Sequence, residues 1–249
     1  MSEASLAAPR YSEGEFRVGR VLTRTFSVLS RNLLPFCVVT AIAYLPSLVV
    51  LAEKGQRMDA GRAALLFGLG SLLAVALNAL SEAIVLFGAF EDMRGRPVNL
   101  MASVRVGLSR LLPVLGVAIL VALFIGLAAI LLLIPAFIVM TMLFVAMPVC
   151  VVEQLGPMQS LRRSRELTKG HRWAIFGLWF LVAIIIALGS NLTTAVGSLI
   201  GGVGVSLLFN LIWGALSGAF NAIMVVVAYH DLRVAKEGVD TDKIASVFD

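Results

Sequence analysis

Between Pro148 and Trp173 the chain reads PVCVVEQLGPMQSLRRSRELTKGHRW, a basic stretch that separates two long apolar blocks. Residues 111–152 contain no charged residue in 42 positions, and residues 173–229 contain none in 57. A helix of about 20 apolar residues crosses a bilayer, so each block is long enough for two crossings. The basic stretch between them is therefore expected to lie at a membrane surface.

Composition indicates the same class of protein. Of the 249 residues 59% are hydrophobic and 14% are charged, and the mean hydropathy is +0.97, whereas soluble domains carry about 25% charged residues. The basic residues behind the net charge of +5 flank the apolar runs. Orientation in a membrane explains them, so no nucleic-acid partner is expected. Cys37 and Cys150 lie in apolar segments and suggest neither a disulfide nor a metal site.

We expect an all-α fold, an integral membrane six-helix bundle within residues 33–230. Residues 1–32 are expected to form a polar N-terminus and an amphipathic interfacial helix, and residues 231–249 a polar cytoplasmic tail. No cleaved signal peptide is expected, because a polar lead precedes the first apolar run near Leu33. The expected spans are approximately 33–51, 64–90, 111–131, 136–152, 173 to a point between 190 and 204, and 205–229.

Two further segments, 16–31 and 91–110, have the pattern of amphipathic helices lying in the headgroup region. The apolar residues that share a face in the first segment are Val18, Leu22, Phe26, Leu29 and Leu33. Those in the second are Met101, Val104, Leu108, Leu111 and Leu112. Arginines occupy other positions of both segments.

The distribution of Lys and Arg predicts the topology. Six spans place both termini on one side, and 17 of the 20 Lys and Arg residues fall on that side: five before the first span, four in 91–110, five in 153–173 and three in the tail. Because basic residues mark the cytoplasmic face, both termini are expected in the cytoplasm.

Three segments suggest an internal repeat. SVLSRNLLPFCVVTAI (27–42) and VRVGLSRLLPVLGVAIL (104–120) share Ser-Arg and Leu-Leu-Pro before a span, and SLRRSRELTKGHRWAIFGLWFL (160–181) keeps the order without the proline. Each unit would be an amphipathic helix followed by a helical hairpin. The alternative is that amphipathic helices before spans converge on this composition.

Polar residues recur at helical spacing inside two expected spans. In the second span, Ser71, Asn78 and Glu82 are separated by steps of seven and four residues. In the sixth span, Asn210, Ser217 and Asn221 have the same two steps. An intramembrane carboxylate suggests proton coupling or a polar ligand contact. The alternative is that Glu82 only fixes helix packing or reaches the headgroups.

Other patterns suggest packing and no chemistry. Gly197 with Gly201, and Gly214 with Gly218, have the spacing that allows close helix approach, within the monomer or in a dimer. No group of His, Cys and carboxylate residues has metal-ligand spacing, and no phosphate-binding loop or nucleophile motif occurs. We therefore expect neither enzymatic activity nor a cofactor.

The basic segments are candidates for binding anionic lipid headgroups, with each basic residue near the surface contributing about 1 kcal/mol. The candidate residues are Arg94, Arg96, Arg105, Arg162, Arg163 and Arg165. Orientation in the membrane is the simpler explanation, and both can hold together.

The quoted stretch resembles the segment that marks the glycerophosphodiester phosphodiesterase membrane-domain family of bacterial multi-pass proteins. The residues that carry the resemblance are Val151–Glu153, Gly156–Pro157, Leu161–Ser164 and Leu167–Gly170, with further similarity at 93–100, 131–138 and 228–240. The resemblance implies a bacterial cytoplasmic membrane protein. It does not imply hydrolysis, because the soluble phosphodiesterase domain of the members that gave the family its name has no counterpart in this sequence.

Two functions remain open. The first is a non-enzymatic membrane protein that organises lipids, membrane-protein partners or copies of itself at the inner leaflet. The second is a small transporter or lipid-handling carrier that uses the polar positions around Glu82 and Asn221. A cavity reaching Glu82 would favour the carrier, and a tightly packed bundle with an apolar outer groove would favour the first function.

Overall fold

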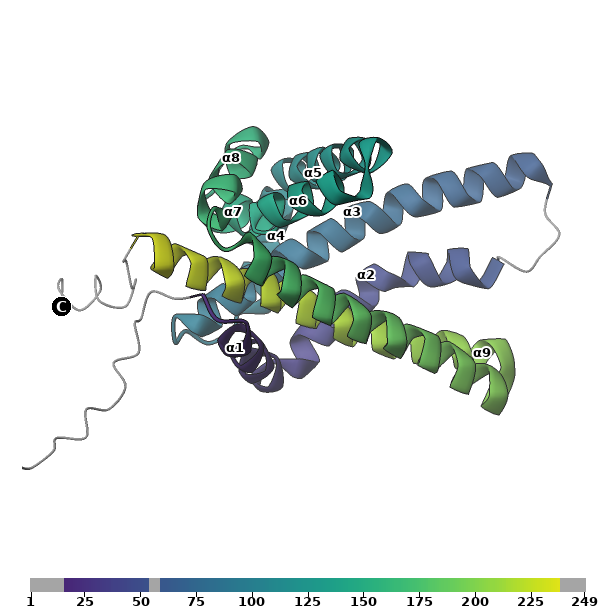
Figure 1. The fold of residues 1–249 in the computed structure, drawn as a ribbon. Coiled ribbons are helices and arrows are strands. Elements are labelled where there is room, and N and C mark those ends of the chain that lie inside the picture. Colours follow the sequence, from purple (N-terminus) through teal and green to yellow (C-terminus); the bar gives the residue numbers. More distant parts are fainter. Residues whose placement is uncertain (1–15, 54–58, 238–249) are drawn as a thin grey trace, which may run out of the picture.

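The computed structural model describes residues 16–53 and 59–237, which fold into helices and short connections with no strand (Figure 1). The helices are α1 (Val18–Arg31), α2 (Leu33–Glu53), α3 (Ala60–Met93), α4 (Leu100–Ser109), α5 (Leu111–Leu131), α6 (Leu133–Leu143), α7 (Ala146–Val152), α8 (Pro157–Thr168) and α9 (Arg172–Glu237). The expected all-α fold is confirmed for these ranges. The loop residues 54–58 and the terminal residues 1–15 and 238–249 lie outside the described residues.

Several helices are long and apolar enough to cross a membrane. Four qualify within the described residues, and the bent pair of α1 and α2 raises the number to five if it counts as one span. Many of their large apolar side chains point outward, among them Leu34, Leu69, Ile130 and Leu199. Water-soluble monomers rarely expose apolar surface of this extent, and a bilayer covers it without cost.

α9 is a helical hairpin. Its helical backbone angles are interrupted at Gly201 and Gly202, where Gly202 has φ of +68°, a conformation that glycine adopts without strain. The two halves run antiparallel (Figure 1), as shown by hydrogen bonds from Trp213 Nε1 to the Ile186 carbonyl at 3.1 Å and from Asn210 Nδ2 to Thr194 Oγ1 at 3.0 Å. The break lies within the range predicted for the end of the fifth span.

The short helices α1, α4 and α8 gather at one end of the molecule, together with the C-terminal part of α9 (Figure 1). We call this the basic end, because α1, α8 and the segment 91–110 contribute most of its arginines. α1 meets α2 at 92°, the angle expected between a helix lying in the interface and a span.

Local sequence sets the limits of these helices. The Asn99 side chain accepts a hydrogen bond from Ala102 N at 3.1 Å and caps α4, and Pro157 occupies the first turn of α8. Gly170, with φ of +93°, makes the turn from α8 into α9. The turn expected between residues 131 and 136 lies at Leu132, whose backbone is extended, and Pro135 falls inside α6.

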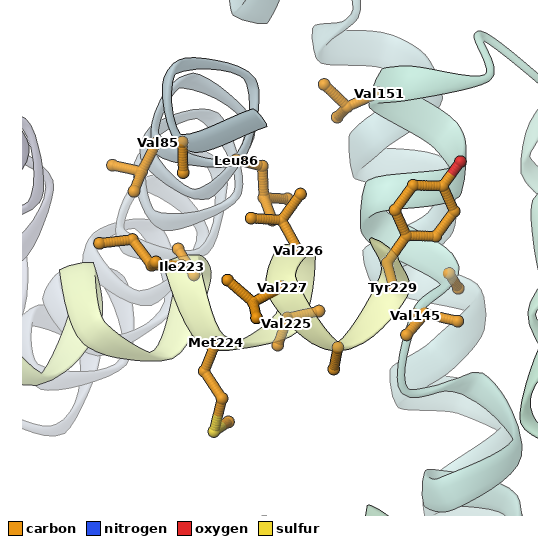
Figure 2. Packing of buried hydrophobic residues seen from close by; sticks show 14 of the residues in the cluster. Val85, Leu86, Val145, Val151, Ile223, Met224, Val225, Val226, Val227 and Tyr229 are labelled. Atoms are coloured by element: carbon orange, nitrogen blue, oxygen red, sulfur yellow. The ribbon is translucent and has the colours of Figure 1, made fainter. Parts of the chain in front are cut away.

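The buried core lies toward the basic end. Residues 222–229 of α9 are all buried. Figure 2 shows Ile223, Val226 and Tyr229 among side chains that include Leu86 of α3 and Val145 near α7. Away from this end the outward-facing residues are large and apolar, such as Leu72, Leu192 and Ile200. The tight contacts therefore hold the basic end together.

The helix α4 turns small residues toward the protein and large apolar ones outward, whereas α1 buries Val28 and Leu29. In α4, Ser103 and Gly107 are buried, and a Cβ on Gly107 would meet Ile84 Cγ1 at 2.7 Å. Met101, Leu108 and Leu112, grouped on one face by the sequence, are 78%, 54% and 81% exposed. This outward apolar face suits a helix lying in the headgroup region.

Candidate functional site at the basic end

α8 presents one face to the protein and another to a cavity. The buried face carries small and apolar residues, namely Ser160, Leu161, Ser164, Leu167 and Thr168. Met158, Arg162 and Arg165 are exposed and follow steps of four and three residues, which places them on a second face. The helix is therefore anchored by hydroxyls and leucines and leaves these two arginines free of the core.

The anchoring of α8 uses the break between α6 and α7. Ser164 Oγ donates a hydrogen bond to the Met142 carbonyl at 2.9 Å. Thr168 Oγ1 lies 3.3 Å from the same oxygen and 2.9 Å from the Ser164 carbonyl, its nearer acceptor. Between α6 and α7, Phe144 keeps helical backbone angles and Val145 does not. The hydrogen bond of Ser164 and the contact of Thr168 hold α8 against the end of α6.

A cavity of about 470 Å³ lies between α5, α6 and α8. Phe124 of α5 and Val139, Met142 and Leu143 of α6 supply apolar walls. Its α8 lining residues are Met158, Gln159, Leu161, Arg162 and Arg165. We call this the α8 pocket. Apolar walls beside two guanidinium groups match the acyl chain and the phosphate of a phospholipid.

The two arginines of the α8 pocket are weakly engaged. Arg162 approaches Glu166 at 3.9 Å, and its side chain is 84% exposed, so the pair contributes little. Arg165 forms no ion pair with any described residue. Both guanidinium groups are therefore available to an external anion.

Arg163 has a different role from its neighbours. It pairs with Glu153 at 3.2 Å and also with Glu237. Glu237 accepts from Arg233 Nε at 2.9 Å, Arg233 Nη1 donates to the Tyr229 hydroxyl at 3.3 Å, and Tyr229 donates to Glu153 Oε1 at 2.9 Å. These five residues close a ring that ties α7 and α8 to the end of α9. We call it the Glu153–Tyr229 ring.

A second polar cavity, of about 700 Å³, lies between α1 and the connection from α3 to α4. Its arginines are already paired: Arg24 with Asp231 at 3.1 Å, Arg31 with Asp92 at 2.6 Å, and Arg96 with Glu91 at 3.2 Å. The nearby carboxylates would repel an anion. This cavity is therefore a poorer anion site than the α8 pocket.

The remaining candidate headgroup residues are dispersed. Arg94 approaches Glu91 at 3.7 Å, and Arg94 and Arg96 are both exposed. Arg105 is exposed on α4 and lines none of the cavities described above. Of the six predicted residues, the structure brings only Arg162 and Arg165 to one apolar cavity.

The two polar series inside the spans do not meet at one cavity. Ser71, Asn78 and Glu82 of α3 line a pocket of about 470 Å³ with residues of α2, α5 and α7. In α9, Asn210 bonds to Thr194 within the hairpin, and Ser217 Oγ donates to its own helix at the Trp213 carbonyl, 2.7 Å away. Asn221 is half-buried and does not line the Glu82 pocket.

The connection between α8 and α9 contains a titratable group. His171 lies beside Phe16, with ring centroids 6.0 Å apart, and its Nδ1 is buried without a hydrogen-bond partner. Burial, and then the positive charge of Lys236, lower the pKa of His171 below its ordinary value. Within residues 16–53 and 59–237, no group of three or more His, Cys, Asp or Glu residues has the arrangement of a metal site.

The chain matches no protein-family model, no curated protein and no solved structure. The resemblance to the glycerophosphodiester phosphodiesterase membrane-domain family therefore remains an expectation that rests on the quoted motif.

Sequence reasoning did not predict the Glu153–Tyr229 ring or the apolar walls of the α8 pocket. Glu153 belongs to the quoted motif, and Tyr229 and Arg233 lie at the expected end of the last span. Their spacing of four residues is compatible with a shared helix face. No pattern in the sequence, however, indicates that α7 and α9 approach each other there.

Proposed function

We propose that this chain is a non-enzymatic multi-pass membrane protein that binds anionic phospholipids at the inner leaflet and organises them, or a membrane-protein partner, around its basic end. The observation that carries the proposal is the α8 pocket, where Arg162 and Arg165 flank apolar walls from α5 and α6. A phosphate group would pair with the guanidinium groups, and an acyl chain would cover the walls.

Charge at the basic end is distributed to favour this ligand. Arg24, Arg31, Arg96 and Arg163 are engaged with carboxylates of the chain itself. Arg162 and Arg165 retain unpaired donors beside an apolar surface. A charge-assisted hydrogen bond between a guanidinium group and a phosphate is stronger than one between neutral groups.

The proposal includes a topology of six spans with both termini in the cytoplasm. The six apolar segments are α2, α3, α5, α6 joined with α7, and the two halves of α9. The order in which α1, α4 and α8 each precede a hairpin supports the three-unit repeat.

In a background without Cys37 and Cys150, Lys169→Cys should be protected from an impermeant thiol reagent in intact cells, and Gly61→Cys should react. The opposite pattern would overturn the topology.

Extraction in a mild neutral detergent followed by native mass spectrometry tests the ligand class. The intact protein should retain anionic phospholipids in excess of their share of the source membrane, while zwitterionic phospholipids should fall below theirs. Retention in proportion to the membrane composition would contradict the proposal.

A carrier is the second candidate, and one observation favours it. The pocket beside α3 reaches Glu82 and Asn78, the feature that distinguishes a carrier from a closed bundle. The polar residues of α9 lie at other contacts and do not complete a shared path with it. Uptake into proteoliposomes under an imposed pH gradient tests this function. Loss of uptake in Glu82→Gln, with the fold retained, would support the carrier, and the absence of uptake by the unaltered chain would exclude proton-coupled transport of the solutes tried.

A further inference from the structure

A cavity of about 470 Å³ lies where α2, α3, α5 and α7 meet. Ser71, Asn78 and Glu82 line it from one face of α3, while Ala118 comes from α5 and Met147 from α7. It shares no lining residue with the α8 pocket. It is a separate site within the apolar part of the molecule, and we call it the Glu82 cavity.

The polar groups of the Glu82 cavity offer it mainly hydrogen-bond acceptors. Asn78 Nδ2 donates to the Ala74 carbonyl at 2.8 Å, and Ser71 Oγ donates to the Gly68 carbonyl at 3.0 Å. Both side chains therefore retain an oxygen that still accepts a hydrogen bond. The carboxylate of Glu82 is also an acceptor when ionised. Ser47 of α2, the remaining polar residue of the lining, has a hydroxyl that can donate or accept. A ligand complementary to the three acceptors on α3 must supply donors.

The chain supplies no positive charge to this carboxylate within the described residues. The cavity lining contains no Lys, Arg or His, and Glu82 forms neither an ion pair nor a hydrogen bond with a described residue. A carboxylate among apolar helices without a partner is unfavourable. A cationic ligand would satisfy it.

The other walls of the cavity are apolar except for Ser47 of α2, and are formed by Ala74, Val75, Ala79, Ala118 and Met147. We propose that the Glu82 cavity binds an amphiphilic primary ammonium compound, with the ammonium group on Glu82 and Asn78 and the apolar body along these walls. The volume falls within the range of small-molecule sites. A bare metal ion would occupy only a small part of it and leave the apolar walls unmatched.

Calorimetric titration of the full chain in phosphatidylcholine nanodiscs tests this site, with empty nanodiscs as the blank. The probes are n-octylammonium, n-octyltrimethylammonium and n-octanol, which share one apolar body. Octylammonium should bind most tightly, because it alone combines positive charge with N–H donors. Glu82→Gln should weaken its binding at least tenfold, since the amide keeps the shape and removes the charge.

Val75→Trp provides a test that leaves Glu82 intact, because Val75 is 52% exposed and lines the cavity. The indole should fill the space and weaken octylammonium binding at least tenfold. Arg162→Gln with Arg165→Gln should leave it unchanged, which separates this site from the α8 pocket. Unchanged binding in either Glu82→Gln or Val75→Trp would overturn the proposal. So would a Glu82-dependent heat of Na⁺ binding in the absence of an octylammonium signal.

Discussion

The hydroxyl of Tyr229 donates a hydrogen bond to Glu153 Oε1 at 2.9 Å, across 76 positions of sequence. The ring of Tyr229 is buried in the core (Figure 2), and its hydroxyl accepts from Arg233 Nη1 at 3.3 Å. The apolar core and the Glu153–Tyr229 ring thus meet at one side chain. This contact holds α7 against the end of α9 and, through Arg163, positions α8.

Tyr229→Phe should lower the free energy of unfolding by about 1–3 kcal/mol, because it removes a hydrogen bond to a charged acceptor and leaves Glu153 with one donor fewer. Chemical denaturation in detergent measures the change. Tyr44→Phe is the matched control, since the Tyr44 hydroxyl forms no hydrogen bond with a described residue. Equal losses of stability in the two variants would contradict a stabilising role for the Tyr229 hydroxyl in the Glu153–Tyr229 ring.

Arg163→Gln should destabilise the fold by roughly 1–3 kcal/mol, because Glu153 and Glu237 would lose a partly buried partner. Arg162→Gln removes the same charge from the adjacent position, where the side chain is 84% exposed, and should change stability by less than about 0.5 kcal/mol. Thermal unfolding of both variants in one detergent compares them. A larger effect at Arg162 would show that the two roles are assigned the wrong way round.

Gly197→Ala should destabilise the α9 hairpin by about 1–3 kcal/mol, because the added Cβ would lie 2.5 Å from the Ser206 Cα of the opposite half. Gly126→Ala in α5 is the control. A Cβ there meets nothing within 4 Å, and alanine is favoured over glycine in a helix by up to about 1 kcal/mol. Melting temperatures of the two variants should therefore move in opposite directions. Tolerance of alanine at position 197 would contradict the close approach of the halves.

Stability should fall as the pH drops below about 6.5, the ordinary His pKa. Burial and Lys236 lower the pKa of His171 in the folded chain, so the unfolded chain binds the proton first as the pH falls. The loss begins near the unfolded pKa and ends once the pH is below the folded pKa. His171→Gln should reduce the slope of stability against pH in this range. The same slope with and without His171 would show that it contributes nothing.

Much of the fold could be predicted because the bilayer imposes simple constraints. The charge-free runs predicted the apolar helices, and the turn-forming and small residues between 190 and 204 predicted the range in which α9 turns. It was harder to predict which face of each helix packs against the rest of the protein. Lipid and protein interior are equally apolar, so hydrophobicity does not show whether Leu108 or Gly107 faces a neighbouring helix. The structure buries Gly107 and leaves Leu108 54% exposed.

The candidate site could be predicted only in part. The sequence grouped Arg162, Arg163 and Arg165 because they are adjacent, but side chains one position apart on a helix point about 100° from each other. The partners Glu153, Tyr229 and Glu237, which separate Arg163 from the other two, are brought near by tertiary packing. The walls of the α8 pocket likewise depend on how α5 and α6 pack beside α8.

We propose that Arg162 and Arg165 bind the headgroup of an anionic phospholipid at the α8 pocket. The decisive measurement is the affinity of the purified chain, in a neutral maltoside detergent, for dioctanoyl-phosphatidylglycerol against dioctanoyl-phosphatidylcholine. Because these short-chain lipids are presented without a charged bilayer, general surface attraction contributes little. The matched pair of variants is Arg162→Gln/Arg165→Gln and Arg105→Gln/Lys169→Gln, which lose the same net charge.

The unaltered chain should prefer the anionic lipid, and the variant Arg162→Gln/Arg165→Gln should bind it at least tenfold more weakly. Each lost charge-assisted hydrogen bond is worth about 1.5–3 kcal/mol, and about 1.4 kcal/mol corresponds to a factor of ten. The control variant should stay within about twofold of the unaltered chain. Equal weakening in the two variants, or no preference for the anionic lipid, would contradict the account.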